Sequence, residues 1–405
     1  MKVVQINTVC DFGSTGRICS EISDYLLSVG IENYIFFGSG NSKRTNAERF
    51  NTDADKKMHA LASRVTGLQA YFSSGATRKM LKRLNKIKPD IVHLHNLHAN
   101  YINVPMLLKY FAQKDIATVI TLHDCWFFTG KCMHYTQAGC YKWKTGCNHC
   151  KKLKNDIPSW FFDRTSKMWN DKNKLFNAIP RLAVIGVSDW ITNEAQQSFL
   201  KNATIIKRIY NWIDLEDFYP QESDIKQKYN IPADKFIILS VSAGWNENSD
   251  KFNDAIKLSK LADKDMHIVL AGSGLNKDKL PDNITAIDYI DGKRELAKLY
   301  SAADVYVHLS REDTFGKVVA EAMACGTPAV VYNTTALPEL IGNNCGYIAS
   351  CGDVKDVYGK LKKIKADTKY KYTKDCISNV QSKFNKQVLI ENTISLYKDI
   401  MLRSN

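Results

Sequence analysis

The stretch that decides the fold is residues 310–328, SREDTFGKVVAEAMACGTP, which has the pattern of a strand end, an acidic loop, a helix and a helix stop. The segment before it, Val305–Leu309, has the apolar composition of a buried strand. Gly326 and Pro328 follow the helix in the way that commonly ends one. Because open α/β sheets bind ligands beyond the carboxyl ends of their strands, the acidic loop marks a candidate binding site.

Two carboxylates flank the start of this helix. Asp313 lies in the loop and Glu321 about two turns into the helix, so they are roughly 10 Å apart along its axis. Between them we expect the N–H groups of Phe315, Gly316 and Lys317 to be free to bind an anion. A nucleotide-diphosphate sugar has this layout, with hydroxyls at both ends and a diphosphate in the middle. The alternative is that Asp313 only caps the helix and that Glu321 is solvated.

The length and composition are those of a globular protein with two domains. The chain has 405 residues, of which 44% are apolar and 24% charged. The sequence has no run of about 18 apolar residues that would span a membrane. The first residues, Met1–Asn7, are too few and too polar for a signal peptide and predict a strand. We therefore expect a cytoplasmic protein.

Strands alternate with helical segments along the whole chain, which predicts parallel sheets. The expected strands are residues 2–7, 32–37, 90–95, 117–122, 181–187 and 205–208 in the first half, and 236–241, 266–271, 284–287, 305–309, 329–331 and 346–349 in the second. This pattern predicts two doubly wound, Rossmann-like α/β domains that face each other across a cleft. Their expected bounds are 1–209, with an excursion rich in cysteine and aromatic residues at 125–150, and 210–380. We expect residues 381–405 to form a final helix that packs back on the N-terminal domain.

The net charge of +14 is placed unevenly. Residues 1–210 hold 30 Lys and Arg against 15 Asp and Glu, a net of +15, and residues 211–405 hold 26 against 27. The densest part, residues 78–88, would form a helix with a basic face beside an apolar one. Such a helix either lies on its own core with its charges in water or docks on anionic lipid. No zinc-finger, RNA-recognition or homeodomain pattern accompanies the charge, so we expect no nucleic-acid partner.

Two further motifs follow strands of the first domain. A glycine loop, Gly13–Arg17, follows the first strand and could approach an anion, with Arg17 at the helix start as a cation. His123 directly follows the strand 117–122. His93, His95 and His98 surround the end of a neighbouring strand. These histidines are either hydrogen-bonded polar residues or, with a nearby Asp, a metal site.

With these motifs in view, the chain resembles a family 4 retaining glycosyltransferase of the GT-B architecture. The resemblance rests on the glycine loop, the TLHD segment at 121–124, the linker-like segment YNWIDLEDFYP at 210–220, and above all on residues 313–328 with their EAMA-x-G-x-P tail. It extends over nearly the whole chain.

The resemblance implies roles for particular residues. Asp313, or Glu312 beside it, would hold donor-sugar hydroxyls, Glu321 the ribose hydroxyls, and His123 would lie near the reacting sugar. The implied catalytic residues are His123, Asp313 and Lys251, and the implied donor-binding residues are Gly13, Gly16, Arg17, Glu312, Thr314, Phe315, Gly316, Lys317, Val318 and Glu321. No metal or other cofactor is expected in catalysis.

The chain departs from the family pattern in two places. Asp313 stands where the family has Glu. The family's Arg/Lys pair that clamps the diphosphate should fall in residues 240–252, where Lys251 is the only cation and Phe252 replaces the usual Gly.

Five cysteines cluster at Cys125, Cys132, Cys140, Cys147 and Cys150. Cys147 and Cys150 have metal-ligand spacing, and Cys132 and Cys140 could complete a tetrahedral zinc site. Reduced thiols and disulfides are the alternatives.

We therefore expect a glycosyltransferase that moves a sugar from a UDP- or GDP-sugar to a lipid-linked oligosaccharide or other glycan of a bacterial surface polysaccharide, such as capsule or O-antigen. The basic N-terminal half suggests peripheral attachment to the anionic inner face of the plasma membrane. A nucleotide-sugar epimerase or hydrolase of the same architecture is the first alternative. A basic nucleic-acid-binding protein is another, but it would leave the Asp313–Glu321 pair unexplained.

Overall fold

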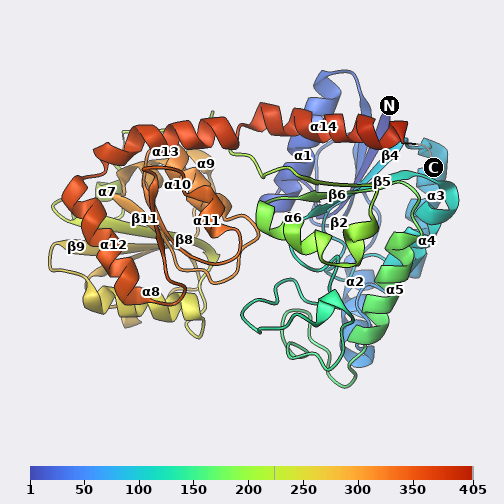
Figure 1. Cartoon of the computed structure of the whole chain (residues 1–405), viewed down its shortest axis with the longest axis horizontal. Helices are drawn as coiled ribbons and strands as arrows, with labels where there is room; N and C mark the ends of the chain where they lie inside the picture. The colour runs from blue at the N-terminus through green and yellow to red at the C-terminus, as the bar shows by residue number, and fades with distance from the viewer. Residues whose placement is uncertain (223, 404–405) are drawn as a thin grey trace. The chain divides into compact units, whose positions relative to one another are not determined.

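A computed structural model describes residues 1–222 and 224–403, so the last two positions of the expected final helix lie outside the described residues. The chain divides into two compact units. The first contains Met1–Ile209 and the chain from Ile390 on, and the second contains Tyr210–Leu389. Each unit is a parallel sheet with helices packed around it (Figure 1).

The sheet of the first unit has seven parallel strands in the order β3-β2-β1-β4-β5-β6-β7. The strands are β1 (Lys2–Val9), β2 (Glu32–Ser39), β3 (Ala47–Arg49), β4 (Ile91–Leu94), β5 (Ala117–Leu122), β6 (Leu182–Gly186) and β7 (Ile205–Arg208). The helices are α1 (Gly13–Ser28), α2 (Asp53–Thr66), α3 (Ser74–Ile87), α4 (Val104–Lys114), α5 (Thr165–Asn177) and α6 (Asp189–Gln196), with the short η1 (Lys142–Lys144) and η2 (Phe199–Asn202). All six expected strands are present, and their apolar runs are buried because helices cover them.

The sheet of the second unit has six parallel strands in the order β10-β9-β8-β11-β12-β13. The strands are β8 (Phe236–Gly244), β9 (Met266–Ser273), β10 (Ile284–Ile287), β11 (Val305–His308), β12 (Ala329–Tyr332) and β13 (Gly346–Ala349). The helices are α7 (Ile225–Lys228), α8 (Asp250–Leu261), η3 (Lys277–Lys279), α9 (Lys293–Ala302), α10 (Lys317–Ala324), α11 (Leu337–Leu340), α12 (Val354–Asp367) and α13 (Tyr370–Lys383). The last helix, α14 (Lys386–Leu402), begins in the second unit and belongs to the first unit from Ile390 on. The doubly wound architecture predicted from the sequence is confirmed in both units.

Both sheets reverse their strand order beside the first strand of the unit. In the first unit, β1 lies between β2 and β4, and in the second, β8 lies between β9 and β11. A doubly wound sheet binds its ligands at such a switch point, beyond the carboxyl ends of the strands. A ligand is therefore expected at the loops after β1, β4 and β5 in the first unit and at those after β8, β9 and β11 in the second.

Two of the expected elements differ in the structure. The final helix is interrupted: α13 ends at Lys383 and α14 begins at Lys386, because Phe384 is buried against Tyr210 and Phe315. The expected glycine loop is mostly helix, since α1 already begins at Gly13.

The basic helix lies on its own core. In α3, Met80, Leu84 and Ile87 are buried, and the basic side chains between them are exposed. Arg83 pairs with Glu48, with 3.2 Å between Nε and Oε2. None of the described helices is both long and apolar enough to cross a membrane.

Candidate functional site

The acidic loop of the second unit follows β11 at the switch point, as expected. Asp313 accepts a hydrogen bond from the N–H of Phe315 on Oδ1, at 3.2 Å, and its Oδ2 lies 3.3 Å from Nε2 of His308. Its own N–H donates to Oγ1 of Thr335 at 3.1 Å. These contacts fix the loop, and they leave the Asp313 side chain 30% exposed at the strand end. The N–H of Phe315, expected to be free for an anion, is therefore occupied.

Glu321 lies on α10, facing inward. Its side chain is buried, and Oε2 accepts a hydrogen bond from the hydroxyl of Tyr300 at 3.3 Å. A buried carboxylate with a hydroxyl donor is poised to accept further hydrogen bonds from a polyol such as ribose. The expectation that Glu321 is merely solvated is excluded by its burial.

The start of α10 is shaped by a glycine. Gly316 is the N-cap, with φ 87°, and no side chain caps the helix. A Cβ at this position would lie 2.8 Å from Cδ2 of Leu337 and 3.0 Å from Cδ1 of Leu340. The residue before it, Phe315, turns its ring into the core. Lys317 and Val318 open the helix and are half-buried, and Thr314 is buried. The uncapped helix start leaves backbone dipoles directed at the strand edge, where an anion would bind.

Lys251 lies on the same edge of the sheet as Asp313. It is the second residue of α8, and its ammonium donates to Oγ of Ser242 and lies 4.6 Å from the ring centroid of Trp245. Burial lowers the pKa of Lys251, while the negative charge of Asp313 raises it. The two side chains thus act on each other electrostatically. The nearby Arg311 is engaged elsewhere, because its guanidinium binds Asp254 at 2.8 Å.

A second glycine turn on this edge escaped the sequence analysis. Gly272, the second-last residue of β9, and Gly274, directly after the strand, have φ of 141° and 86°. A Cβ on Gly272 would collide with the carbonyl oxygen of Ser242, and Trp245 donates its N–H to the Ser273 carbonyl at 2.7 Å. The loops after β8 and β9 are therefore packed together beside Lys251. The signal was two glycines at the end of a strand.

In the first unit, the histidines form a buried hydrogen-bonded network. Nδ1 of His95 lies 3.0 Å from Nε2 of His123, and Nε2 of His95 lies 3.1 Å from Oε1 of Gln5. His93 contacts the hydroxyls of Tyr397 and Thr121 at 2.6 and 2.7 Å. Burial lowers the pKa of His123 to about 4 and that of His95 well below its usual value, so both are neutral at pH 7.

His98 and Asp124 form a separate pair, with 2.7 Å between Nε2 and Oδ2. Burial raises the pKa of Asp124, but the charge and hydrogen bond of His98 outweigh this and lower it. Within residues 1–222 and 224–403, no three His, Cys, Asp or Glu side chains are arranged to hold a metal ion. The hydrogen-bonded alternative for the histidines is therefore the one found.

The predicted glycine motif after β1 is divided between two roles. Gly13, with φ 64°, is exposed at the start of α1. Gly16 is buried inside the first turns, where a Cβ would lie 3.1 Å from Cγ2 of Val9, so it lets α1 pack closely on β1. Arg17 is half-buried on the same helix.

The five clustered cysteines are all free thiols. Cys147 accepts a hydrogen bond from the N–H of Gly130 at 3.2 Å, and a hydrogen bond with the Cys132 thiol lowers the pKa of Cys150. In the described structure, no three side chains of the cluster are arranged to hold a metal ion, which applies to Cys132, Cys140, Cys147 and Cys150. Structural zinc at this cluster stays a prediction.

Comparison with known proteins identifies the family. A family model described as Glycosyltransferase Family 4 matches residues 15–217, just over half of the chain, and one described as Glycosyl transferases group 1 matches residues 221–383. The chain belongs to glycosyltransferase family 4. The family resemblance predicted from the sequence is thereby confirmed.

The relatives of this glycosyltransferase include bacterial proteins named for surface polysaccharides. The "Putative colanic acid biosynthesis glycosyl transferase WcaC" of Escherichia coli (strain K12) is 22% identical over 99% of this chain and 100% of that protein. The "O-antigen chain mannosyltransferase B" of Escherichia coli is 32% identical over a shorter stretch, 26% of this chain and 27% of that protein.

Solved structures share the fold. A sucrose-phosphate synthase from Thermosynechococcus elongatus has a TM-score of 0.70 at 17% identity and covers 100% of both chains. Anabaena Alr3699/HepE in complex with UDP has a TM-score of 0.69 at 15% identity and covers 98% of this chain and 100% of its own. The two α/β units of this glycosyltransferase thus have the GT-B fold.

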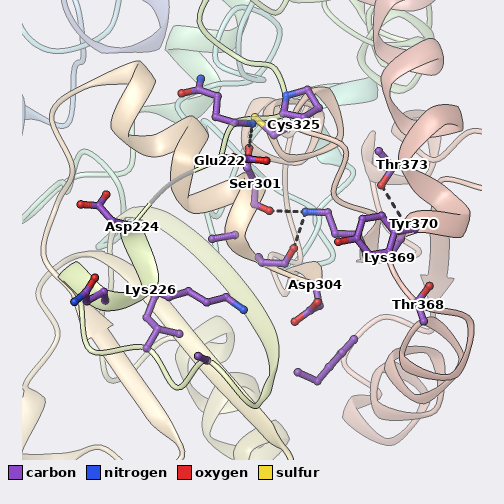
Figure 2. A pocket seen from close by; sticks show the side chains of 18 of the residues that line it. Glu222, Asp224, Lys226, Ser301, Asp304, Cys325, Thr368, Lys369, Tyr370 and Thr373 are labelled. Carbon is purple, nitrogen blue, oxygen red and sulfur yellow. Dashed lines mark hydrogen bonds between the residues drawn. The ribbon is translucent and has the colours of Figure 1, made fainter.

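One pocket of the second unit of this glycosyltransferase lies away from these residues. It has a volume of about 1290 Å³ and is lined by Phe236, the first residue of β8, and by residues just before β11, among them Asp304. Figure 2 shows Asp304 and other lining residues. Lys369 fills part of it and donates to the carbonyls of Ser301 and Ala303 at 2.6 and 2.9 Å. Because the strands are parallel, this pocket opens at the amino-terminal edge of the sheet, opposite Asp313.

Proposed function

We propose that this protein is a retaining glycosyltransferase that moves a sugar from a UDP- or GDP-sugar to a lipid-linked oligosaccharide or other glycan acceptor of a bacterial surface polysaccharide. The observation that carries the proposal is the edge beyond β8 and β11. There a half-buried carboxylate (Asp313), an ammonium (Lys251), an uncapped helix start and a buried carboxylate (Glu321) belong to one switch point.

Each group on this edge has a role in the proposed reaction. Asp313, or its neighbour Glu312, accepts hydrogen bonds from hydroxyls of the donor sugar, and Glu321 accepts them from the ribose. Lys251 and the backbone dipoles at Gly316 and Lys317 stabilise the charge that develops on the leaving diphosphate. We propose that these groups stabilise the leaving group and that catalysis is independent of a metal.

His123 is proposed to lie beside the reacting sugar. It is neutral at pH 7, because burial lowers its pKa to about 4, so it acts as a hydrogen-bonding group rather than as a cation. The names of the relatives support the polysaccharide setting: one is named for colanic acid and another for the O-antigen chain. We propose that the enzyme works at the cytoplasmic face of the membrane, where lipid-linked acceptors are accessible.

The first experiment is a thermal-shift screen with UDP-, GDP- and dTDP-sugars, followed by product analysis with and without a lipid-linked acceptor. We expect one donor class to raise the melting temperature, and Glu321→Gln to remove most of this shift. The matched control is Glu216→Gln, an exposed carboxylate of the same unit outside the site. An unchanged shift in Glu321→Gln would refute the ribose role. Donor turnover that needs no acceptor would favour an epimerase or hydrolase instead.

A further inference from the structure

Three consecutive aromatic side chains of the first unit project into solvent. Trp160, Phe161 and Phe162 are 45%, 68% and 50% exposed. Neighbouring rings contact each other, with 6.3 Å between the centroids of Trp160 and Phe161 and again between those of Phe161 and Phe162. Single exposed apolar residues are ordinary, but a contiguous exposed apolar patch commonly marks a surface that binds something.

A stripe on α2 continues this surface. Met58, Leu61 and Val65 are 73%, 55% and 37% exposed and share one face of the helix, since they are spaced by three and four residues. The aromatic segment lies beside the end of this stripe: the N–H of Trp160 donates to the carbonyl of Arg64 at 2.7 Å. We call the six side chains the aromatic patch: Met58, Leu61, Val65, Trp160, Phe161 and Phe162.

The backbone under the aromatic patch is firmly anchored. Ser159 is buried and donates its hydroxyl to the carbonyl of Phe162 at 2.6 Å. The side chain of Gln69 donates to the carbonyl of Ile157 at 2.9 Å. Gly67 ends α2 in the left-handed region, and a Cβ there would collide with the Phe162 carbonyl oxygen. The three rings are therefore held outward by a fixed turn.

The charge around the aromatic patch is basic. The two segments that carry it, residues 53–66 and 150–165, have seven basic side chains: Lys56, Lys57, Arg64, Lys151, Lys152, Lys154 and Arg164. The guanidinium of Arg164 lies 5.4 Å from the ring centroid of Phe162. The same two segments carry four acidic side chains, Asp53, Asp55, Asp156 and Asp163, of which Asp53 pairs with Arg49 and Asp156 with Lys152. The basic side chains outnumber the acidic ones by seven to four, so the two segments together attract anions.

We propose that the aromatic patch inserts into the headgroup region of an anionic lipid bilayer. Tryptophan and phenylalanine are the side chains that partition into this region, and flanking lysine and arginine bind the anionic headgroups. The basic face of α3 differs from the aromatic patch, because it exposes charged side chains without apolar ones beside them. It can therefore give only a salt-sensitive attraction to anionic lipid. The inference rests on the proposed function in one respect only: insertion would give the enzyme access to a lipid-linked acceptor.

The test is sedimentation of the full chain with sucrose-loaded vesicles of phosphatidylglycerol and phosphatidylcholine, without donor or acceptor. We expect the wild type to bind, and the triple variant Trp160→Ser, Phe161→Ser, Phe162→Ser to bind at least about tenfold more weakly. Tyr370→Ser removes an aromatic ring of the second unit that is 87% exposed, and this control should bind like the wild type. Exposed positions tolerate such changes, and an unchanged melting temperature checks this for each variant.

A second measurement separates insertion from surface attraction. Bilayer insertion of Trp160 predicts that brominated lipids quench part of the tryptophan emission of the wild type and less of that of Trp160→Phe. Equal sedimentation of the wild type and the triple variant would overturn the proposal. So would a wild-type dimer, measured by light scattering, that the triple variant abolishes without any vesicle binding. Because vesicle binding is measured without sugar transfer, a failed glycosyltransferase assay and a failed docking surface remain distinguishable.

Discussion

Nδ1 of His95 lies 3.0 Å from Nε2 of His123, and the two rings stack with 5.3 Å between centroids. The proton positions in this pair follow from Gln5. Its side-chain N–H donates to the carbonyl of Cys19 at 2.9 Å, so its oxygen faces Nε2 of His95 and that nitrogen carries the proton. Nδ1 of His95 must then accept, and Nε2 of His123 must donate. This series of hydrogen bonds, from the Cys19 carbonyl through Gln5 and His95 to His123, therefore selects one tautomer of His123.

The first prediction concerns this tautomer. We expect Gln5→Leu to allow both tautomers of His95 and to reduce the population of the Nε2–H form of His123, which long-range ¹H–¹⁵N correlation spectra distinguish. If His123 contacts the donor sugar, kcat should fall about tenfold while the KM for donor changes little. Thr121→Val removes a partner of His93 only and should leave the His123 spectrum unchanged. An unaltered tautomer in Gln5→Leu would show that Gln5 does not set it.

The second prediction concerns Lys251. Lys251→Met should lower kcat/KM about tenfold or more, since it removes the charge that stabilises the leaving diphosphate. The control, Lys257→Met, changes an exposed lysine of the same helix and should have little effect. Because burial lowers the pKa of Lys251, the activity of the wild type should fall as the pH rises, beginning below the range of an ordinary lysine. This decrease of activity at high pH should be absent from the pH profile of the residual activity of Lys251→Met.

The sequence predicted the strands and the position of the acidic loop well, because both depend on local pattern. Buried parallel strands appear as apolar runs, and the loop at Asp313 follows one of them directly. The structural features that the sequence did not predict depend on contacts between segments that are distant in the chain. The short strand β3 at Ala47–Arg49 has no apolar run, and the helix break at Phe384 exists because that ring packs against Phe315. The role of Gly16 is likewise visible only beside Val9.

The third prediction concerns the loop before α1. Burial raises the pKa of Asp11, but hydrogen bonds from Ser42, Arg44 and Ser20 outweigh this and bring the pKa down to about 2. Since its pKa is lower in the folded state, the ionised carboxylate stabilises the fold above about pH 4, and this contribution is lost as the pH falls toward 2. The side chain is partly exposed, so we expect Asp11→Asn to lower the free energy of unfolding at pH 7 by only about 1 kcal/mol. Urea unfolding should show this difference shrinking below pH 4, and a pH-independent difference would contradict the assignment.

The fourth prediction concerns the cysteine cluster. If Cys132, Cys140, Cys147 and Cys150 bind structural zinc, protein purified without chelator contains about one zinc ion per chain. Cys147→Ser should then lose the metal and melt at a lower temperature, whereas Cys10→Ser, at a buried thiol elsewhere in the same unit, should keep it. Elemental analysis decides the matter, and zinc-free protein with four titratable thiols in the cluster would end the hypothesis.

The last prediction concerns the helix start at the donor site. Gly316 has φ 87°, and a Cβ there would lie 2.8 Å from Leu337 and 3.0 Å from Leu340. Gly316→Ala should therefore lower the free energy of unfolding by about 1–3 kcal/mol and displace the start of α10. Gly359 is the matched control, since it lies inside α12 and a Cβ there would meet no atom within 4 Å. Gly359→Ala should stabilise the protein by about 1 kcal/mol through helix propensity alone.

Because the displaced helix start also carries the backbone dipoles that face the diphosphate, donor-induced thermal stabilisation should decrease in Gly316→Ala and not in Gly359→Ala. Equal stabilisation by donor in both variants would mean that the start of α10 does not contact the diphosphate.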